Sequence, residues 1–119
     1  MRRHDVPPEL LQGTLDMMIL NVLAIAPNHG YGVARRIRQT SGDILSVEEG
    51  SLYPALHRLE RRGCITAEWR ISENNRRAKY YHLTSRGRQL LRKERSNWRK
   101  LSRAVGRVMG AAPEPETGS

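Results

Sequence analysis

The stretch that decides the fold is Gly50-Ser51-Leu52-Tyr53-Pro54-Ala55-Leu56-His57-Arg58-Leu59-Glu60. Its apolar residues follow the spacing i, i+3, i+4 and i+7, which predicts a helix with one buried face; they are Leu52, Ala55, Leu56 and Leu59. We expect this helix to span about 49–62, with Gly63 as its C-terminal cap. Residues 46–49 have the form of a capping box. Pro54, however, suits only a first turn and favours a start nearer Gly50 or Ser51.

Two further helices are predicted upstream of this stretch. Apolar residues recur at helical spacing from Glu9 to about Ala26, at Leu11, Leu15, Met18, Ile19, Val22 and Leu23. The run 27–30, Pro-Asn-His-Gly, ends that helix. A shorter helix follows at about 31–40, with Val33, Ala34 and Ile37 on its inner face. Residues 1–8 are polar, end in two prolines, and are expected to form a flexible arm.

Downstream of Gly63 the hydrophobic period changes from 3.6 to 2, which indicates β-structure. Ile65, Ala67, Trp69 and Ile71 alternate with polar residues, 72–77 is a polar turn, and 79–83 is a second strand with Tyr81 and Leu83 on its inner face. The segment is therefore predicted to be a β-hairpin with a basic tip.

The last helix is expected at 85–109, capped by Thr84. Its apolar residues form two interleaved series with a spacing of seven, which is typical of a helix that packs against another helix; they are Leu91, Trp98 and Val105, and Leu101 and Val108. The tail 110–119 is rich in Ala, Pro, Glu, Gly and Ser and is expected to be disordered.

Charge indicates the kind of partner. The chain has 119 residues and a net charge of +9, from 21 basic and 12 acidic residues. Of these, 16 basic but only 4 acidic residues lie between His57 and Arg107. This concentration of positive charge favours nucleic acid or another anionic surface. We expect no membrane span and no signal peptide, and hence a cytoplasmic protein.

Together these elements predict an α+β, mostly α, fold: a winged helix-turn-helix DNA-binding domain over 9–84 and a long C-terminal dimerisation helix over 85–109. The third helix would enter the major groove of double-stranded DNA, and the basic hairpin tip would reach the minor groove or its phosphates. The predicted DNA-binding residues are Arg36, Gly50, Ser51, Tyr53, Pro54, His57, Arg58, Arg61, Asn75, Arg76, Arg77 and Lys79.

Two other classes of function are alternatives to DNA binding. An enzyme is disfavoured because the four histidines have no metal-ligand spacing, and neither an acidic pair nor a Gly-rich phosphate loop is present. The single cysteine, Cys64, excludes an internal disulfide and a Cys-based zinc site, and no cofactor is expected. A winged helix that binds protein or RNA, with no sequence preference on duplex DNA, is the stronger alternative.

Four segments of the chain resemble the PadR family of transcriptional regulators. The resemblance covers about residues 10–108 and is carried by Gln12-Gly13-Thr14-Leu15-Asp16, His29-Gly30-Tyr31-Gly32, the 50–60 stretch quoted above and Lys79-Tyr80-Tyr81-His82-Leu83-Thr84. The most specific of these are the Gly-Ser-Leu-Tyr-Pro-Ala-Leu run and the strand end Tyr81-His82-Leu83-Thr84. One departure is that Glu48-Glu49 stands where the family commonly has Ser-Pro.

The resemblance implies a homodimer that usually represses a nearby promoter and often releases DNA on binding a small, frequently aromatic effector. The C-terminal helix would pack against the partner's N- and C-terminal helices. The expected interface residues are Leu11, Leu15, Met18, Leu91, Trp98, Leu101, Val105 and Val108. Trp98 has two interpretations: packing between helices, or lining a pocket in which it stacks on a planar effector.

Overall fold

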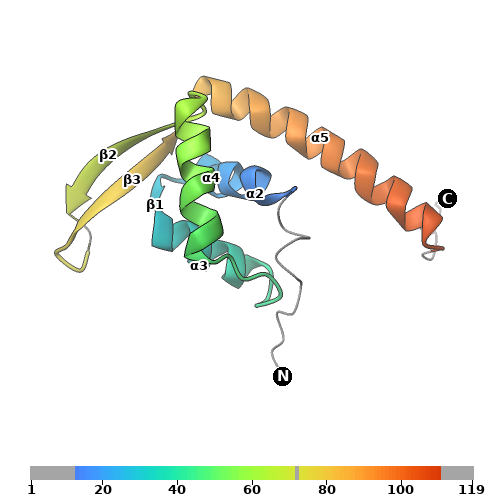
Figure 1. Cartoon of the computed structure of the whole chain (residues 1–119), viewed down its shortest axis with the longest axis horizontal. Helices are drawn as coiled ribbons and strands as arrows, with labels where there is room; N and C mark the ends of the chain where they lie inside the picture. The colour runs from blue at the N-terminus through green and yellow to red at the C-terminus, as the bar shows by residue number, and fades with distance from the viewer. Residues whose placement is uncertain (1–12, 72, 111–119) are drawn as a thin grey trace.

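The structure, a computed structural model, describes residues 13–71 and 73–110. The elements in chain order are α2 (Leu15–Ile25), β1 (Asn28–His29), α3 (Gly30–Thr40), α4 (Glu49–Arg61), β2 (Ile65–Ile71), β3 (Arg77–Leu83) and α5 (Ser85–Val108). Figure 1 shows the β2–β3 hairpin projecting from one side of the helical body and α5 extending from the other. This is the predicted winged helix-turn-helix with a long C-terminal helix.

The core lies where α2 meets α3, α4 and the base of the hairpin. The predicted stripe of α4 is fully confirmed, because all four of its apolar side chains are buried. From α2 the core takes Leu15, Ile19, Leu20 and Leu23, and from α3 Val33 and Ile37. The start predicted for the first helix, at Glu9, lies outside the described residues.

The two ends of α4 differ in how well they were predicted. At the C-terminal end Gly63 has φ +77° and its N–H bonds to the Glu60 carbonyl at 3.0 Å, while the Cys64 N–H bonds to the Leu59 carbonyl at 2.9 Å. This pair of bonds is a Schellman motif and confirms the glycine cap.

At the N-terminal end of α4 the predicted capping box is wrong. The cap is Glu48, whose side chain makes no capping bond. Its carbonyl instead accepts the N–H groups of Ser51 and Leu52, at 3.0 and 2.9 Å. The helix begins one residue before Gly50, so Pro54 lies in its second turn; the ring of a proline there faces the carbonyl of Gly50.

The segment Pro27–Gly30 was predicted only to end a helix, and this was incomplete. Asn28 and His29 form β1, which pairs antiparallel with Tyr81 and Tyr80 of β3, so the wing is a three-stranded sheet in the order β1-β3-β2. His29 also caps α3, because its Nδ1 accepts the Gly32 N–H at 3.0 Å.

The hairpin is longer than predicted at one strand. β3 begins at Arg77 rather than Lys79, because Ile71↔Arg77 and Arg70↔Ala78 complete the ladder with β2. Only the base of its inner face is covered: Ile65 and Tyr81 are buried, whereas Trp69 and Ile71 are 58% and 63% exposed. The distal half of the hairpin therefore extends past the body.

α5 starts at a tight junction with the end of α4 and the start of β2. The Thr84 hydroxyl accepts the Gly87 N–H at 3.0 Å, which confirms the predicted cap, and donates to the Gly63 carbonyl at 2.7 Å. The Thr84 N–H bonds to the Cys64 carbonyl at 3.1 Å. A Cβ on Gly87 would stand 2.1 Å from that same carbonyl oxygen, so only glycine permits this approach.

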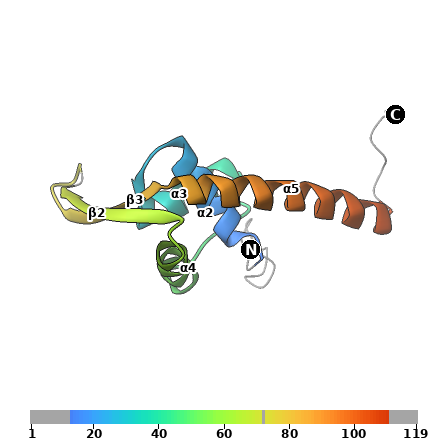
Figure 2. The same ribbon diagram turned by 90° about the horizontal axis from the view of Figure 1, so that it is seen from above.

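The C-terminal half of α5 leaves the body. Seen from above in Figure 2, it continues beyond α2 and α3 without another element beside it. The apolar side chains at this end are exposed to between 43% and 84%; they are Trp98, Leu101, Val105 and Val108. The proposed tail beyond residue 110 and the N-terminal arm lie outside the described residues.

Candidate nucleic-acid interface

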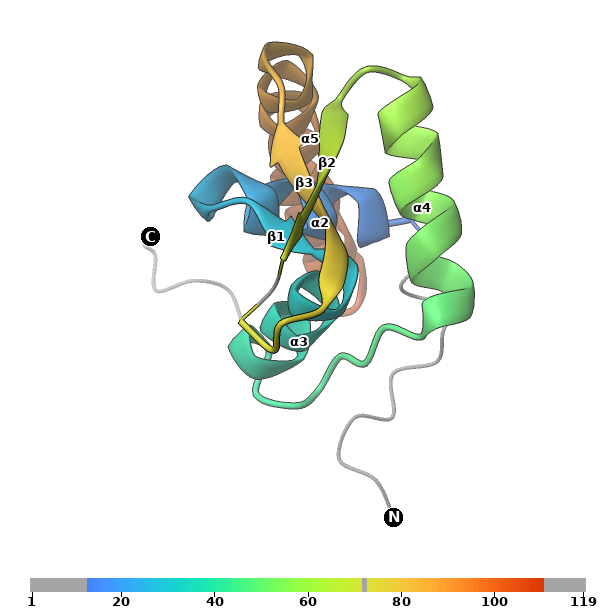
Figure 3. The same ribbon diagram turned by 90° about the vertical axis from the view of Figure 1, so that its left-hand side faces the viewer.

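The outer face of α4 is open to solvent along its whole length. Figure 3 shows the helix on the outside of the body, next to the β2–β3 ribbon. The seven residues predicted from the helical spacing are all exposed, and so is Glu49, the first residue of the helix; the seven are Gly50, Ser51, Tyr53, Pro54, His57, Arg58 and Arg61. Small residues lie at the N-terminal end and basic ones at the C-terminal end, so the backbone can approach a duplex closely at one end and the cations can meet phosphates at the other.

Two of these residues are also engaged within the chain. The Arg58 guanidinium donates to the Asp16 carboxylate on α2 at 2.8 Å. The Tyr53 ring covers Gly30 at the start of α3, where an added Cβ would lie 2.8 Å from the phenol oxygen. Arg58 and Tyr53 therefore fix α4 against its neighbouring helices, and each leaves only part of its side chain for DNA.

The wing carries the predicted basic tip. Asn75 has φ +58°, a left-handed conformation that Asn tolerates in tight turns. Arg76 and Arg77 follow it and are exposed. Lys79 points back toward α4, because its Nζ lies 3.6 Å from the Glu60 carboxylate, so it links the wing to α4.

Two cations of α3 line a hollow of about 460 Å³ beside the start of α4; they are Arg35 and Arg38, and Tyr31 lines it as well. Arg36, the predicted DNA-binding residue of this helix, is exposed and is not among the lining residues. Glu48 and Glu49 line the same hollow, so the departure from the family pattern brings two carboxylates into a hollow that two arginines also line. Helical spacing identifies the inner face of α3, but it does not tell which flank faces α4.

The other face of the wing holds a polar cluster. Glu68 accepts from Arg70 at 2.8 Å and lies 3.1 Å from Nε2 of His82. These two hydrogen bonds, that of Arg70 first, hold the pKa of the Glu68 carboxyl below its usual range. On the inner face, burial raises the pKa of the Tyr81 phenol above its usual value.

A family model describes this arrangement of elements. The model of the transcriptional regulator PadR-like family matches residues 19–93, from α2 into α5. The chain belongs to the PadR-like family. It is therefore a member of a family of transcriptional regulators, not of a family of enzymes.

Solved structures agree with this assignment. A PadR family transcriptional regulator from Eggerthella lenta is 32% identical and superposes with a TM-score of 0.72, over 85% of this chain and 86% of that one. A transcriptional regulator from Clostridium thermocellum is 25% identical, with a TM-score of 0.76, over 83% and 96% of the two chains. A comparison of sequences agrees as well: the transcriptional regulator Rv3488 of Mycobacterium tuberculosis is 39% identical over 59 residues, half of this chain and 54% of its own length.

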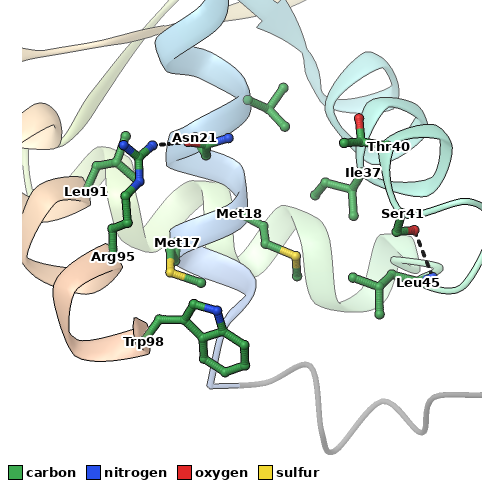
Figure 4. Close-up of a pocket in the computed structure, with 11 residues that line it drawn as sticks. Met17, Met18, Asn21, Ile37, Thr40, Ser41, Leu45, Leu91, Arg95 and Trp98 are labelled. Carbon is green, nitrogen blue, oxygen red and sulfur yellow. Dashed lines mark hydrogen bonds between the residues drawn. The ribbon is translucent and has the colours of Figure 1, made fainter. Parts of the chain in front are cut away.

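This PadR-like chain also has a pocket of about 330 Å³ between α2, the end of α3 and α5. Figure 4 shows Met17, Met18 and Trp98 around it, with Ile37 and Leu45 on the far side. At its edge Arg95 of α5 bonds to Asn21 of α2. The walls are mainly apolar, with the indole of Trp98 at one end.

The described residues, 13–71 and 73–110, contain neither a candidate metal site nor a candidate membrane span. Within them no group of three or more His, Cys, Asp or Glu side chains is placed to hold a metal ion. Within the same ranges no helix has the length and apolar character needed to cross a membrane.

Proposed function

We propose that this PadR-like regulator is a cytoplasmic homodimer that binds an inverted-repeat operator in duplex DNA and represses the adjacent promoter. α4 of each protomer would lie in a major groove and the wing would reach the flanking minor groove or its phosphates. A two-fold dimer would hold the two reading helices about 34 Å apart, one turn of DNA.

The observation that carries the proposal is the division of α4 into two faces. Its apolar stripe is buried, so the opposite face is the one available to a partner. The hairpin beside α4, joined to it by the ion pair of Lys79 with Glu60, ends in a basic tip. A charged helix face alone is often merely solvated, but here it coincides with a wing of the same charge and with membership of a regulator family.

The dimer is proposed from the apolar stripe of α5. Trp98, Leu101, Val105 and Val108 stand exposed along the half of the helix that leaves the body. Burial of such a stripe against a second copy would remove substantial apolar surface from water. Leu15 and Leu91 are buried in the core of the chain itself and are left out of this interface, while Met18 lines the adjoining pocket. Leu11 lies outside the described residues.

An effector site is proposed at the pocket beside Trp98. Its volume of about 330 Å³ lies in the range of small-molecule sites, which are mostly apolar with a few polar groups. An indole at one end suits stacking on a planar aromatic ligand. Because the walls come from α2, α3 and α5, an occupant would contact both the proposed dimer helix and the body that carries α4.

Selection from random-sequence duplex DNA at about 150 mM salt tests the DNA-binding part. We expect recovery of one inverted-repeat motif, and sedimentation should give a dimer. Recovery of unrelated fragments that are lost as salt rises would leave only charge-driven contact and would favour the protein- or RNA-binding alternative. A reporter gene with the recovered motif between promoter and start site then tests repression.

Substitutions separate phosphate anchors from base readers. Arg61→Ala and Arg76→Ala should weaken binding to all sequences and flatten its salt dependence. His57→Ala should change which sequence is preferred, and Tyr53→Ala should do so too, with some loss of packing at Gly30. Equal effects of all four substitutions on every sequence would contradict this assignment.

The effector site is tested by Trp98→Ala with Leu101→Ala as its control. Leu101 lies on the same helix and is not among the residues that line the pocket. We expect Leu101→Ala to weaken the dimer only, whereas Trp98→Ala should abolish release of operator by planar aromatic compounds. Loss of the dimer alone in both variants would show that Trp98 only packs between helices.

A further inference from the structure

Trp69 is an apolar side chain on the wing that the fold leaves uncovered. It lies on the strand face that begins with buried Ile65 and continues through Ala67 to Ile71. The body covers the base of this face, and Trp69 remains 58% exposed. Packing within the described chain therefore does not account for an indole at this position.

This strand face is the one that turns toward α4. Lys79 is the partner of Trp69 in the ladder, and residues opposite each other in an antiparallel pair project from the same face. The Lys79 ammonium reaches Glu60 of α4 at 3.6 Å. Trp69 therefore lies on the side of the wing that a duplex seated on α4 would meet.

The indole is held by a cation. The guanidinium carbon of Arg77 lies 4.7 Å from the centre of the Trp69 ring, a cation–π contact. The contact fixes one face of the ring, and a guanidinium in that position can still donate N–H bonds from its edge. The pair thus presents a flat apolar surface next to a charge that suits phosphate.

We propose that Trp69, positioned by Arg77, is a DNA-contacting residue of the wing. Its indole packs against deoxyribose edges in the minor groove beside the half-site, and Arg77 bonds to a flanking phosphate. Duplex DNA is the occupant that charge favours, because Arg77 contacts the indole, Lys79 is its ladder partner, and narrow minor grooves attract such cations. This inference rests on the proposed function.

The chain has only two tryptophans, so fluorescence can report on this one directly. In Trp98→Phe, Trp69 is the sole indole. We expect its emission to change as operator duplex is added, with the same midpoint as the anisotropy of labelled operator, and DNA to protect it from acrylamide quenching. Sedimentation checks that this variant is still a dimer.

Two substitutions divide the apolar contact from the ionic one. Trp69→Ala should weaken operator binding about tenfold and leave the salt slope unchanged. Arg77→Ala should reduce that slope by about one. Ile25→Ala is the control, because Ile25 is exposed to a similar extent, 64%, and belongs to α2; its affinity should equal that of the wild type.

The outcomes distinguish the two proposals. If the wild-type protein selects no operator, the proposed function fails. If it binds an operator while Trp69 keeps its emission and quenching, and Trp69→Ala binds like Ile25→Ala, only the contact at Trp69 is refuted. Should Trp69→Ala fail to fold, the Trp98→Phe titration alone decides.

Discussion

Replacing Gly87 with alanine tests the junction that joins α5 to the winged helix. The new Cβ would stand 2.1 Å from the Cys64 carbonyl oxygen and 2.6 Å from a methyl of Leu83. Real Cβ atoms essentially never lie closer than 3.0 Å to such a neighbour, so α5 and the Cys64 peptide, which lies just before β2, must separate by about 0.9 Å, the difference between 3.0 and 2.1 Å. The oxygen belongs to the backbone and cannot rotate away as a side chain would.

The magnitude follows from three contributions. Overpacking at a fixed contact costs about 1–3 kcal/mol. Separation also weakens the hydrogen bond from the Thr84 N–H to the same carbonyl, 3.1 Å long, at a cost of about 0.5–1.5 kcal/mol. Alanine regains at most about 1 kcal/mol of helix propensity. We therefore expect a net loss of about 1–3 kcal/mol, or roughly 10 °C in Tm for a domain of this size.

Urea unfolding followed by circular dichroism, at one fixed protein concentration because the proposed dimer couples to stability, measures this loss. Gly50→Ala is the matched control: it also replaces a helical glycine, but its Cβ meets nothing within 4 Å. The control should keep or gain stability while weakening operator binding, since Gly50 lies on the reading face. If Gly87→Ala were as stable as Gly50→Ala, the close approach at Cys64 would be refuted.

Three further predictions concern the core, pH and the reading helix. Leu56→Ala, at a fully buried position, should lower the free energy of unfolding by about 2–5 kcal/mol in urea titrations. Because the pKa of Tyr81 is raised above 10.0, its contribution to stability is complete below pH 10 and is lost as pH rises through the higher folded value; Tyr81→Phe should reduce this alkaline decline in pH-dependent melts. Asp16→Asn should change stability by less than about 1 kcal/mol, since its pair with Arg58 is partly exposed. It should also free Arg58 for phosphate and steepen the salt dependence of DNA binding, and an unchanged slope would count against this.

The features that were predicted correctly from the sequence are those that depend only on residues close to one another in the chain. The stripe of α4 is complete within eight residues, so both its buried face and its exposed face follow from spacing alone. Gly63 and Thr84 act on the groups next to them, and local chemistry was sufficient to identify both caps.

The features that were missed depend on distant or flanking partners. β1 forms because Asn28 pairs with Tyr81 of β3. A strand of only two residues has no sequence pattern from which this pairing could be predicted. The bond between Arg58 and Asp16 spans 42 positions. That Arg35 and Arg38 of α3 lie beside the start of α4 depends on where α4 packs, and helical periodicity does not contain this. Trp69 belongs to the alternating apolar series that was predicted, but it stays 58% exposed because the hairpin is longer than the body that could cover it.

The junction at Gly63, Cys64, Thr84 and Gly87 gives α5 the character of a lever. The helix has 24 residues and is about 36 Å long at 1.5 Å per residue; it is clamped at this junction and held to the body again at Leu91 and Arg95. A tilt of about 5° about Leu91 would move Val108, roughly 26 Å further along the helix, by about 2 Å. Most of the proposed contact with a second copy lies on this far arm, while Trp98, which belongs both to that contact and to the pocket, lies nearer the junction. Small displacements at the pocket would thus be enlarged where two copies meet, and the stiffness of the clamp would set how much variation in half-site spacing the assembly tolerates.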